Sequence, residues 1–251
     1  MDYQETERIN TKLMNAISAG DAEKTEILLR AGADPNYSCP WGETPLLRAI
    51  SHRKPAIVAL LLDAGADINS EDEYGNTALM RAAERGGYES VNLIADAGAD
   101  INRTNKHGRG SLHFAAEQED PRTVMVLVTN GARCDIRDKN GMTPLAAAAY
   151  YGNAEVMSEL VRAGADPAVQ AKDGRTALHY AGMNGLVTSM RVLIRKGSDP
   201  YIADINGRTP FDELKFCHPE KYGRHFNDLT FTAEKAGMSA RAEGSLCETC
   251  I

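Results

Sequence analysis

Apolar residues within positions 42–71 fall into two short clusters, each with helical spacing. The first covers residues 46–52, and the second covers residues 55–62. The apolar face of the second cluster is formed by Ile57, Val58, Leu60 and Leu61. The pattern therefore predicts two helices, neither long enough to be stable alone in water.

The polar positions around these clusters mark where the helices begin and end. Thr44 precedes the first cluster and can accept a hydrogen bond from a free backbone N–H of the first turn. Pro45 follows at the first helical position, where a missing N–H costs nothing. Gly65 ends the second helix, and residues 66–69 start a hairpin-like loop toward the next glycine.

The same arrangement returns every 33 residues along the chain. One glycine series is Gly42, Gly75, Gly108, Gly141, Gly174 and Gly207, and a second is Gly32, Gly65, Gly98, Gly131, Gly164 and Gly197. A fixed period of this length is typical of a stacked array in which neighbouring units bury each other's apolar faces. The chain is therefore expected to grow by addition rather than around one central core.

The repeated sequence motifs resemble those of the ankyrin repeat over roughly residues 6 to 215. They are Thr44-Pro45-Leu46, Thr143-Pro144-Leu145 and Thr209-Pro210-Phe211 after the first glycines, and Gly-Ala-Asp-x-Asn at residues 32–36, 65–69 and 98–102. The resemblance implies an all-α solenoid of about seven helix-turn-helix units with hairpin-like loops. By phase the domain spans 6–236, with units at about 6–38, 39–71, 72–104, 105–137, 138–170, 171–203 and a partial 204–236.

Some segments depart from the repeat. In unit 105–137, Gly110 replaces the capping threonine, and Asp120-Pro121 offers a fresh start for the second helix. Glu159 stands where other units have an aliphatic residue, so the helix is rotated there or the carboxylate reaches an arginine or solvent. We expect a last helix over 221–238 and a loose tail over 237–251.

Composition limits the function classes. The net charge is −7 and the pI about 5.4, so a nucleic-acid partner is not expected. Since no stretch approaches about 18 uninterrupted apolar residues, no membrane partner is expected either. Five scattered cysteines argue for a reducing compartment rather than a disulfide framework. No apolar run suits a signal peptide or a membrane span, so we expect an intracellular, most simply cytoplasmic, monomer. Export as an effector leaves no such signal and stays open.

No catalytic constellation is visible, and we expect neither an enzyme, nor a cofactor, nor a metal. His113 and His179 occupy the fourth place of the Thr-Pro-Leu-His word, and the resemblance implies that they hydrogen-bond neighbouring loops. Cys247-x-x-Cys250 is a single thiol pair, whereas zinc usually requires about four ligands. No glycine is followed directly by lysine, which excludes a P-loop.

The resemblance implies that a partner protein binds on a concave face of hairpin tips and first helices. Phase places several aromatic residues and arginines on that face, types enriched at interface hot spots. The candidates are Trp41, Arg48, Tyr74, Arg81, Arg85, Phe114, Tyr151 and Tyr180. The alternative for the rings is packing between adjacent units.

Three further hypotheses concern modification and partner type. Asn69, with Leu61 eight residues before it, resembles a substrate of an asparaginyl hydroxylase, unless it only hydrogen-bonds its own loop. The last four residues, Glu248 to Ile251, resemble a PDZ ligand, which would make the chain an adaptor that bridges two proteins. The same array could instead act as an effector or inhibitor that occludes an enzyme.

Overall fold

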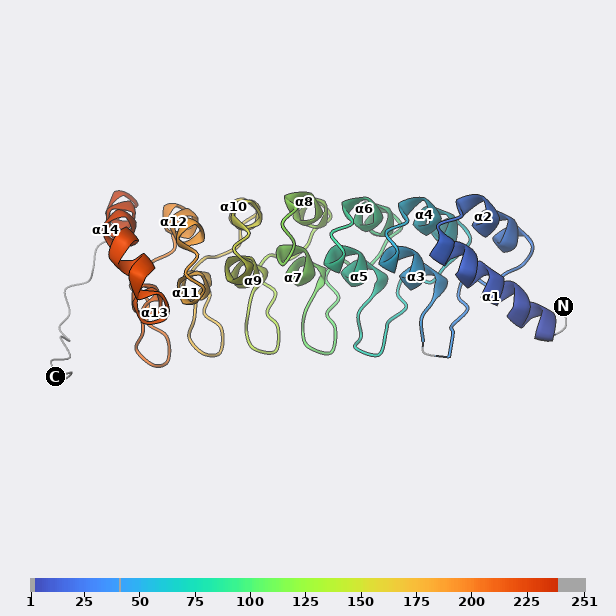
Figure 1. The fold of residues 1–251 in the computed structure, drawn as a ribbon, viewed down its shortest axis with the longest axis horizontal. Coiled ribbons are helices and arrows are strands. Elements are labelled where there is room, and N and C mark those ends of the chain that lie inside the picture. Colours follow the sequence, from blue (N-terminus) through green and yellow to red (C-terminus); the bar gives the residue numbers. More distant parts are fainter. Residues whose placement is uncertain (1–2, 41, 239–251) are drawn as a thin grey trace.

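A computed structural model describes residues 3–40 and 42–238, which form fourteen helices and no strand (Figure 1). The helices are α1 (Tyr3–Ala19), α2 (Ala22–Arg30), α3 (Pro45–Ser51), α4 (Pro55–Asp63), α5 (Ala78–Glu84), α6 (Tyr88–Asp96), α7 (Ser111–Ala116), α8 (Pro121–Thr129), α9 (Pro144–Tyr151), α10 (Ala154–Arg162), α11 (Ala177–Met183), α12 (Val187–Arg195), α13 (Pro210–Cys217) and α14 (Pro219–Lys235). The all-α solenoid is confirmed. Within the described part of the chain, no helix is long and apolar enough to cross a membrane.

The helices form two parallel rows. Odd-numbered helices make one row, even-numbered helices make the other, and the hairpin loops extend beyond the odd-numbered row (Figure 1). Backbone hydrogen bonds join successive loop tips: Lys106 N donates to Tyr74 O at 3.0 Å, and Lys139 N donates to His107 O at 2.9 Å. We call the surface of odd-numbered helices and hairpin loops the groove face.

The helix ends follow the expected chemistry. Thr44 Oγ1 accepts from Leu47 N at 3.3 Å, and Pro45 is the first residue of α3. Helix α4 begins at Pro55 and ends at Asp63, one residue beyond the predicted end. Gly65 then adopts a φ of +85°, which is strained for any residue with a Cβ.

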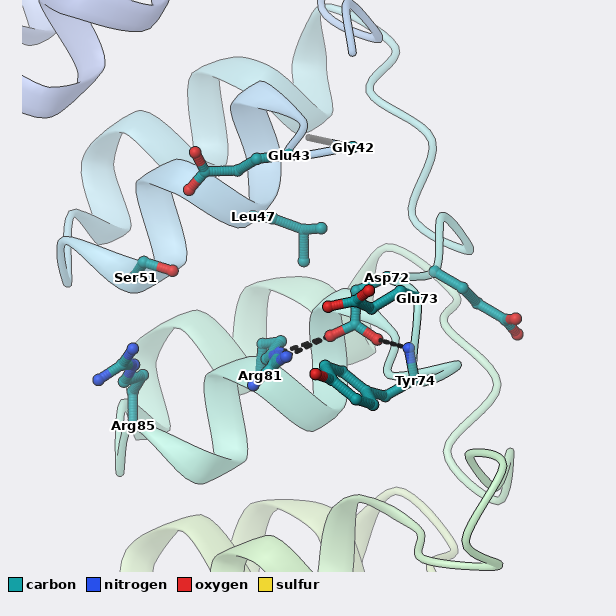
Figure 2. A pocket seen from close by; sticks show the side chains of 10 residues that line it. Gly42, Glu43, Leu47, Ser51, Asp72, Glu73, Tyr74, Arg81 and Arg85 are labelled. Carbon is teal, nitrogen blue, oxygen red and sulfur yellow. Dashed lines mark hydrogen bonds and ion pairs between the residues drawn. The ribbon is translucent and has the colours of Figure 1, made fainter. Parts of the chain in front are cut away.

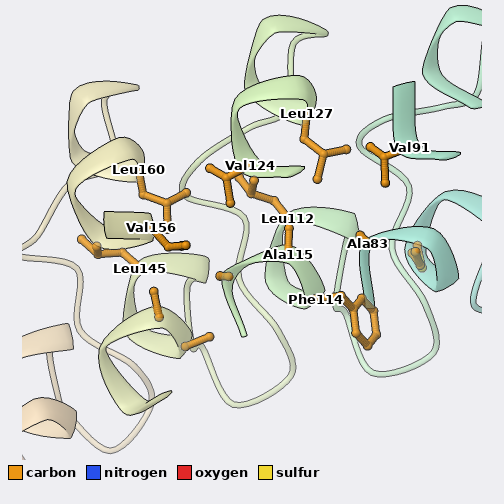
Figure 3. Packing of buried hydrophobic residues seen from close by; sticks show 14 of the residues in the cluster. Ala83, Val91, Leu112, Phe114, Ala115, Val124, Leu127, Leu145, Val156 and Leu160 are labelled. Carbon is orange, nitrogen blue, oxygen red and sulfur yellow. The ribbon is translucent and has the colours of Figure 1, made fainter. Parts of the chain in front are cut away.

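The core is continuous along the array because each unit shares its apolar face with both neighbours (Figure 3). Equivalent leucines illustrate this: Leu46, Leu79, Leu112, Leu145 and Leu178 are each at most 2% exposed. Full burial of a leucine side chain is worth roughly 1.5–3 kcal/mol. Each unit therefore depends on its neighbours for most of its stability.

The two histidines bridge adjacent units as expected. His113 Nδ1 accepts from Gly110 N at 3.2 Å, and its Nε2 lies 3.0 Å from the Met142 carbonyl of the next unit. His179 repeats this arrangement, with Nε2 3.0 Å from Arg208 O. These contacts fix the neutral ring with the proton on Nε2. Burial lowers the pKa of both imidazoles, although the carbonyl contacts raise it.

The irregular segments are accommodated locally. Asp120 accepts from Arg122 N at 3.0 Å and caps α8, with Pro121 at the first helical position. Glu159 is half-buried and pairs with Arg162, so of the sequence-based alternatives the contact with an arginine is the one that forms. The last predicted helix is present as α14, which begins at Pro219 and ends at Lys235. The predicted loose tail from 239 onward, including Cys247, Cys250 and the Glu248–Ile251 ending, lies outside the described residues.

Candidate functional site

A pocket of about 600 Å³ opens on the groove face between the second and third units (Figure 2). Its walls come from α3 and the residues just before it, from the middle and C-terminal end of α5, and from the hairpin loop before α5. Tyr74, Arg81 and Arg85, predicted from phase alone, all line it. The structure therefore brings three of the predicted binding residues into one cavity.

The pocket offers groups that the protein itself leaves free. The ring of Tyr74 is 51% exposed at the hairpin tip. Arg85 is exposed at the end of α5, and its guanidinium makes no ion pair with the described residues. Glu73 is exposed near the opposite end, and its carboxylate is likewise unpaired within the described chain. The site therefore presents a cation, an anion and an aromatic ring.

Arg81, in contrast, is paired with carboxylates of the protein itself. Its Nε donates to Asp72 Oδ2 at 2.9 Å, and its Nη1 donates to Glu84 Oε2 at 2.8 Å. Burial raises the pKa of Asp72, but hydrogen bonds from Asn76 and the guanidinium of Arg81 outweigh it and hold that pKa below its usual range. Arg81 therefore positions the hairpin more than it offers charge to a partner.

Asp72 also fixes the position of Tyr74. Its Oδ1 accepts from the backbone N–H of Tyr74 at 2.9 Å (Figure 2). The same oxygen accepts from the backbone N–H of Asn76, also at 2.9 Å. This Asx-type turn sets the hairpin tip that carries the ring. Sequence reasoning missed Asp72, although an acidic residue three places before the glycine recurs at Asp138 and Asp204 and could have indicated it.

Arg48 lies beside the pocket rather than in its wall. Its Nη2 donates to Glu43 Oε2 at 2.6 Å and its Nε to the same oxygen at 3.0 Å, and its side chain is only 17% exposed. Glu43 is the pocket-lining member of this pair, together with Leu47, which sequence reasoning also missed. Leu47 gives the pocket an apolar wall between the charged groups.

The predicted exposure of Phe114 and Tyr180 is wrong. Phe114 is 8% exposed and packs under Arg109, with the guanidinium carbon 4.3 Å from the ring centroid. Tyr180 is 7% exposed, and its hydroxyl lies 3.4 Å from each carboxylate oxygen of Asp173. This helical position faces the neighbouring unit, so a ring there is covered by the adjacent loop and helix.

Tyr151 is exposed, as predicted, but it lies far along the array from the pocket. It is 54% exposed and meets Tyr150 edge to face at 5.3 Å between centroids. Tyr150 in turn lies 6.5 Å from Tyr180. The three rings form a separate aromatic ledge on α9 and α11.

Two predicted residues stay untested. Trp41 lies outside the described residues. Asn69 is exposed, and its backbone N–H donates to Asp67 Oδ1 at 2.9 Å. Its equivalent Asn102 bridges to the next unit through Gly131 O at 3.0 Å, but within the described chain the Asn69 side chain makes no such bridge.

The groups that line the site are suited to binding. Within residues 3–40 and 42–238, no three histidine, cysteine or acidic side chains cluster in a way that could hold a metal ion. The described cysteines, Cys39, Cys134 and Cys217, are free thiols. The pocket's groups can form ion pairs, hydrogen bonds and aromatic contacts with a macromolecular surface.

Comparison with known proteins now identifies the family. The family described as "Ankyrin repeats (3 copies)" matches residues 13–105 and 112–204. The ankyrin repeat domain of Bcl-3, titled a unique member of the IkappaB protein family, is similar with a TM-score of 0.71 at 29% identity, over 80% of this chain and 92% of that one.

A second solved structure, the human ASB11 ankyrin repeat domain, shares the fold. Its TM-score is 0.75 at 21% identity, over 83% of this chain and 96% of that one. Comparison with curated protein sequences gives no match. Ankyrin repeats are in general protein–protein interaction modules and non-enzymatic scaffolds. The chain belongs to the ankyrin repeat family.

Proposed function

We propose that this chain is a non-enzymatic protein-binding module whose partner occupies the groove face at the pocket between the second and third units. The observation that carries the proposal is the pocket of about 600 Å³ with Tyr74 half-exposed and with the Arg85 guanidinium and the Glu73 carboxylate unpaired among the described residues. Arginine and tyrosine are enriched among residues that dominate binding energy.

The fixed geometry of the pocket supports this function. Asp72 holds the hairpin tip through two backbone hydrogen bonds, and Arg81 ties that loop to α5. A partner therefore meets a surface that is already ordered, which limits the entropic cost of binding. The free charges of opposite sign at Arg85 and Glu73 favour a partner segment that itself carries both signs.

The test compares two double variants, one altered in the groove pocket and one altered elsewhere on the surface. Tyr74→Ala/Arg85→Ala removes an exposed large side chain and an unpaired arginine from the pocket, whereas Met125→Ala/Arg133→Ala removes an exposed apolar side chain and an exposed arginine elsewhere. Proteins captured from lysate by the unaltered chain are identified by mass spectrometry, and one is then purified for calorimetry. We expect at least about tenfold weaker binding for the pocket variant alone. Equal binding by both variants refutes the choice of surface.

The adaptor, effector and inhibitor alternatives use the same groove and differ in what else is bound. Deleting Glu248–Ile251 separates the adaptor from simple groove binding, because only an adaptor loses a second partner while the groove partner is retained. Inhibition of a purified partner enzyme by the intact chain, but not by the Tyr74→Ala/Arg85→Ala variant, identifies the inhibitor. An intracellular location agrees with the free thiols of Cys39, Cys134 and Cys217.

A further inference from the structure

Helices α12 and α14 lie side by side at the C-terminal end of the array (Figure 1). A second pocket, of about 490 Å³, lies between the first turn of α12 and α14. It is remote in sequence from the groove pocket and shares no residue with it. Its walls are the turn at Gly185–Leu186, the first turn of α12 and the facing side of α14. The pocket plays no part in the proposed binding of a protein on the groove face.

The first turn of α12 leaves its backbone donors available. Leu186 occupies the N-cap position, and no side chain caps the helix. Helices α4, α6 and α10 also have no side-chain cap, whereas in α2 and α8 Asp21 and Asp120 accept from the first-turn amides, so the uncapped end alone does not single out α12. The first N–H groups of a helix have no intrahelical acceptor, and together with the helix dipole they favour an anion.

Ser189 supplies an independent indication of a ligand. It is only 2% exposed, it lines the pocket, and its hydroxyl has no hydrogen-bond partner among the described residues. Although the residue is almost fully buried, its hydroxyl oxygen is not sealed from solvent. The hydroxyl therefore opens into the pocket, where it can donate to a bound group. The hydroxyl of Thr188, which also lines the pocket, is similarly unpaired within the described chain.

Helix α14 adds cations opposite the hydroxyls. Arg224 is exposed and makes no ion pair within the described chain. Lys221 donates from Nζ to Gly185 O at 3.0 Å, which holds its ammonium beside the turn that leads into α12. His225 completes this wall. Three potential cations thus face the uncapped helix.

The pocket wall contains no carboxylate. The nearest acids on α14 have other contacts: Asp228 pairs with Arg191, and Glu220 lies 3.9 Å from His218 Nδ1. The whole chain carries a net charge of −7, so it repels anions in general. A site that attracts an anion must therefore do so through these local groups.

We propose that this pocket binds a phosphate monoester. Its oxygens would accept from the first-turn amides of α12, from the hydroxyls of Thr188 and Ser189, and from Arg224. A phosphate dianion matches this set because it presents three acceptor oxygens and about two negative charges. The same chemistry is carried by a phosphorylated serine of a protein and by a small soluble phosphate, and the experiment separates these sources.

The test follows backbone amide signals of the full chain by NMR at constant ionic strength. The probes are inorganic phosphate, a short phosphoserine peptide and the same peptide without phosphate. We expect saturable shifts at Val187, Thr188 and Ser189 with both phosphate probes and none with the unphosphorylated peptide. Tighter binding of the phosphopeptide assigns a phosphorylated protein as the source, and equal binding assigns a small phosphate.

Variants separate binding from folding. Thr188→Glu should abolish the shifts while leaving the helix intact, because an acidic residue in the first turn favours a helix. Ser189→Ala and Arg224→Gln should each weaken binding about tenfold, since each removes one hydrogen bond to a charged group. Arg133→Gln, which removes an exposed arginine on another loop, should bind as the unaltered chain does.

Three results overturn the proposal. The first is the absence of saturable shifts at α12. The second is equal binding by folded Thr188→Glu, with circular dichroism confirming the fold. The third is a response centred on Tyr88–Ser90 of α6, the other uncapped helix with a serine in its third position, whose pocket contains Glu89.

Discussion

Two glycines inside helices should respond to the same substitution with opposite changes in stability. Gly182 lies in α11, and Gly223 lies in α14, both with ordinary helical backbone. A Cβ on Gly182 would lie 2.5 Å from the carbonyl oxygen of Pro210 in α13, whereas a Cβ on Gly223 would meet nothing within 4 Å. The pair therefore separates close packing from helix propensity.

The expected magnitudes follow from these two surroundings. Alanine is favoured over glycine within a helix by about 0.8–1.0 kcal/mol, so Gly223→Ala should raise the free energy of unfolding by up to that amount. At Gly182 the same gain is opposed by overpacking against backbone, which costs about 1–3 kcal/mol or more. We expect Gly182→Ala to lower the free energy of unfolding by about 1 kcal/mol and the two variants to differ by about 2 kcal/mol.

The assay is urea unfolding followed by circular dichroism, with hydrogen exchange to locate the change. Because stability in a repeat array is summed over units and interfaces, the loss should appear first as faster exchange in α13 and α14. Stabilisation by Gly182→Ala equal to that by Gly223→Ala would refute the close approach of α11 to α13. Uniform loss of protection along all units would refute the local origin of the effect.

Three further predictions concern polar contacts inside the array. His179→Ala should lower the free energy of unfolding by about 2–4 kcal/mol in thermal denaturation, because it leaves the Arg208 carbonyl and the Thr176 amide without partners; a loss under 1 kcal/mol contradicts the bridge. Burial holds the folded pKa of His179 below its usual 6.5, so the unfolded chain binds protons first as pH falls. Stability should therefore be complete above about pH 6.5 and decline below it, and this dependence should weaken in the His179→Ala variant. Arg175→Leu removes the guanidinium 2.9 Å from the buried Glu213 carboxylate and should cost about 3 kcal/mol in urea unfolding; Arg175→Leu/Glu213→Leu should recover part of that loss, and no recovery contradicts the pairing.

Much of the fold could be predicted from the sequence because the determining interactions are local and repeated. Thr44 and Pro45 start a helix through contacts within one turn, and Gly65 ends the next through its own backbone freedom. Because the unit returns every 33 residues, each unit packs its apolar face on the next unit along the chain. The order of the units in space can therefore be predicted without knowing any contact between distant parts of the sequence. Even the bridging role of His113 follows from the repeat, since its partner is always one unit away.

The candidate site was only partly predictable. The position within the 33-residue repeat correctly placed Tyr74 and Arg85 on the groove face. It predicted the same exposure for equivalent positions in every unit, however, whatever residue stands there. Phe114 and Tyr180 share the helical position of Arg81, yet both rings are buried. All three side chains contact the hairpin of their own unit, through Asp72 for Arg81, Arg109 for Phe114 and Asp173 for Tyr180, but phase does not predict how much of each side chain the surrounding residues cover.

The sequence by itself determined the unit, its helix ends and the direction in which units add, because each rests on contacts within a unit or between identical neighbours. Only the tertiary structure decided where the surface is hollow and which charges are free. The pairing of Arg81 with Asp72 depends on the distance between a helix and the hairpin of its own unit, and the meeting of α12 with α14 depends on side chains of two different units. Pockets form between units according to the particular side chains that adjacent units carry, and a periodic pattern carries no information about such differences.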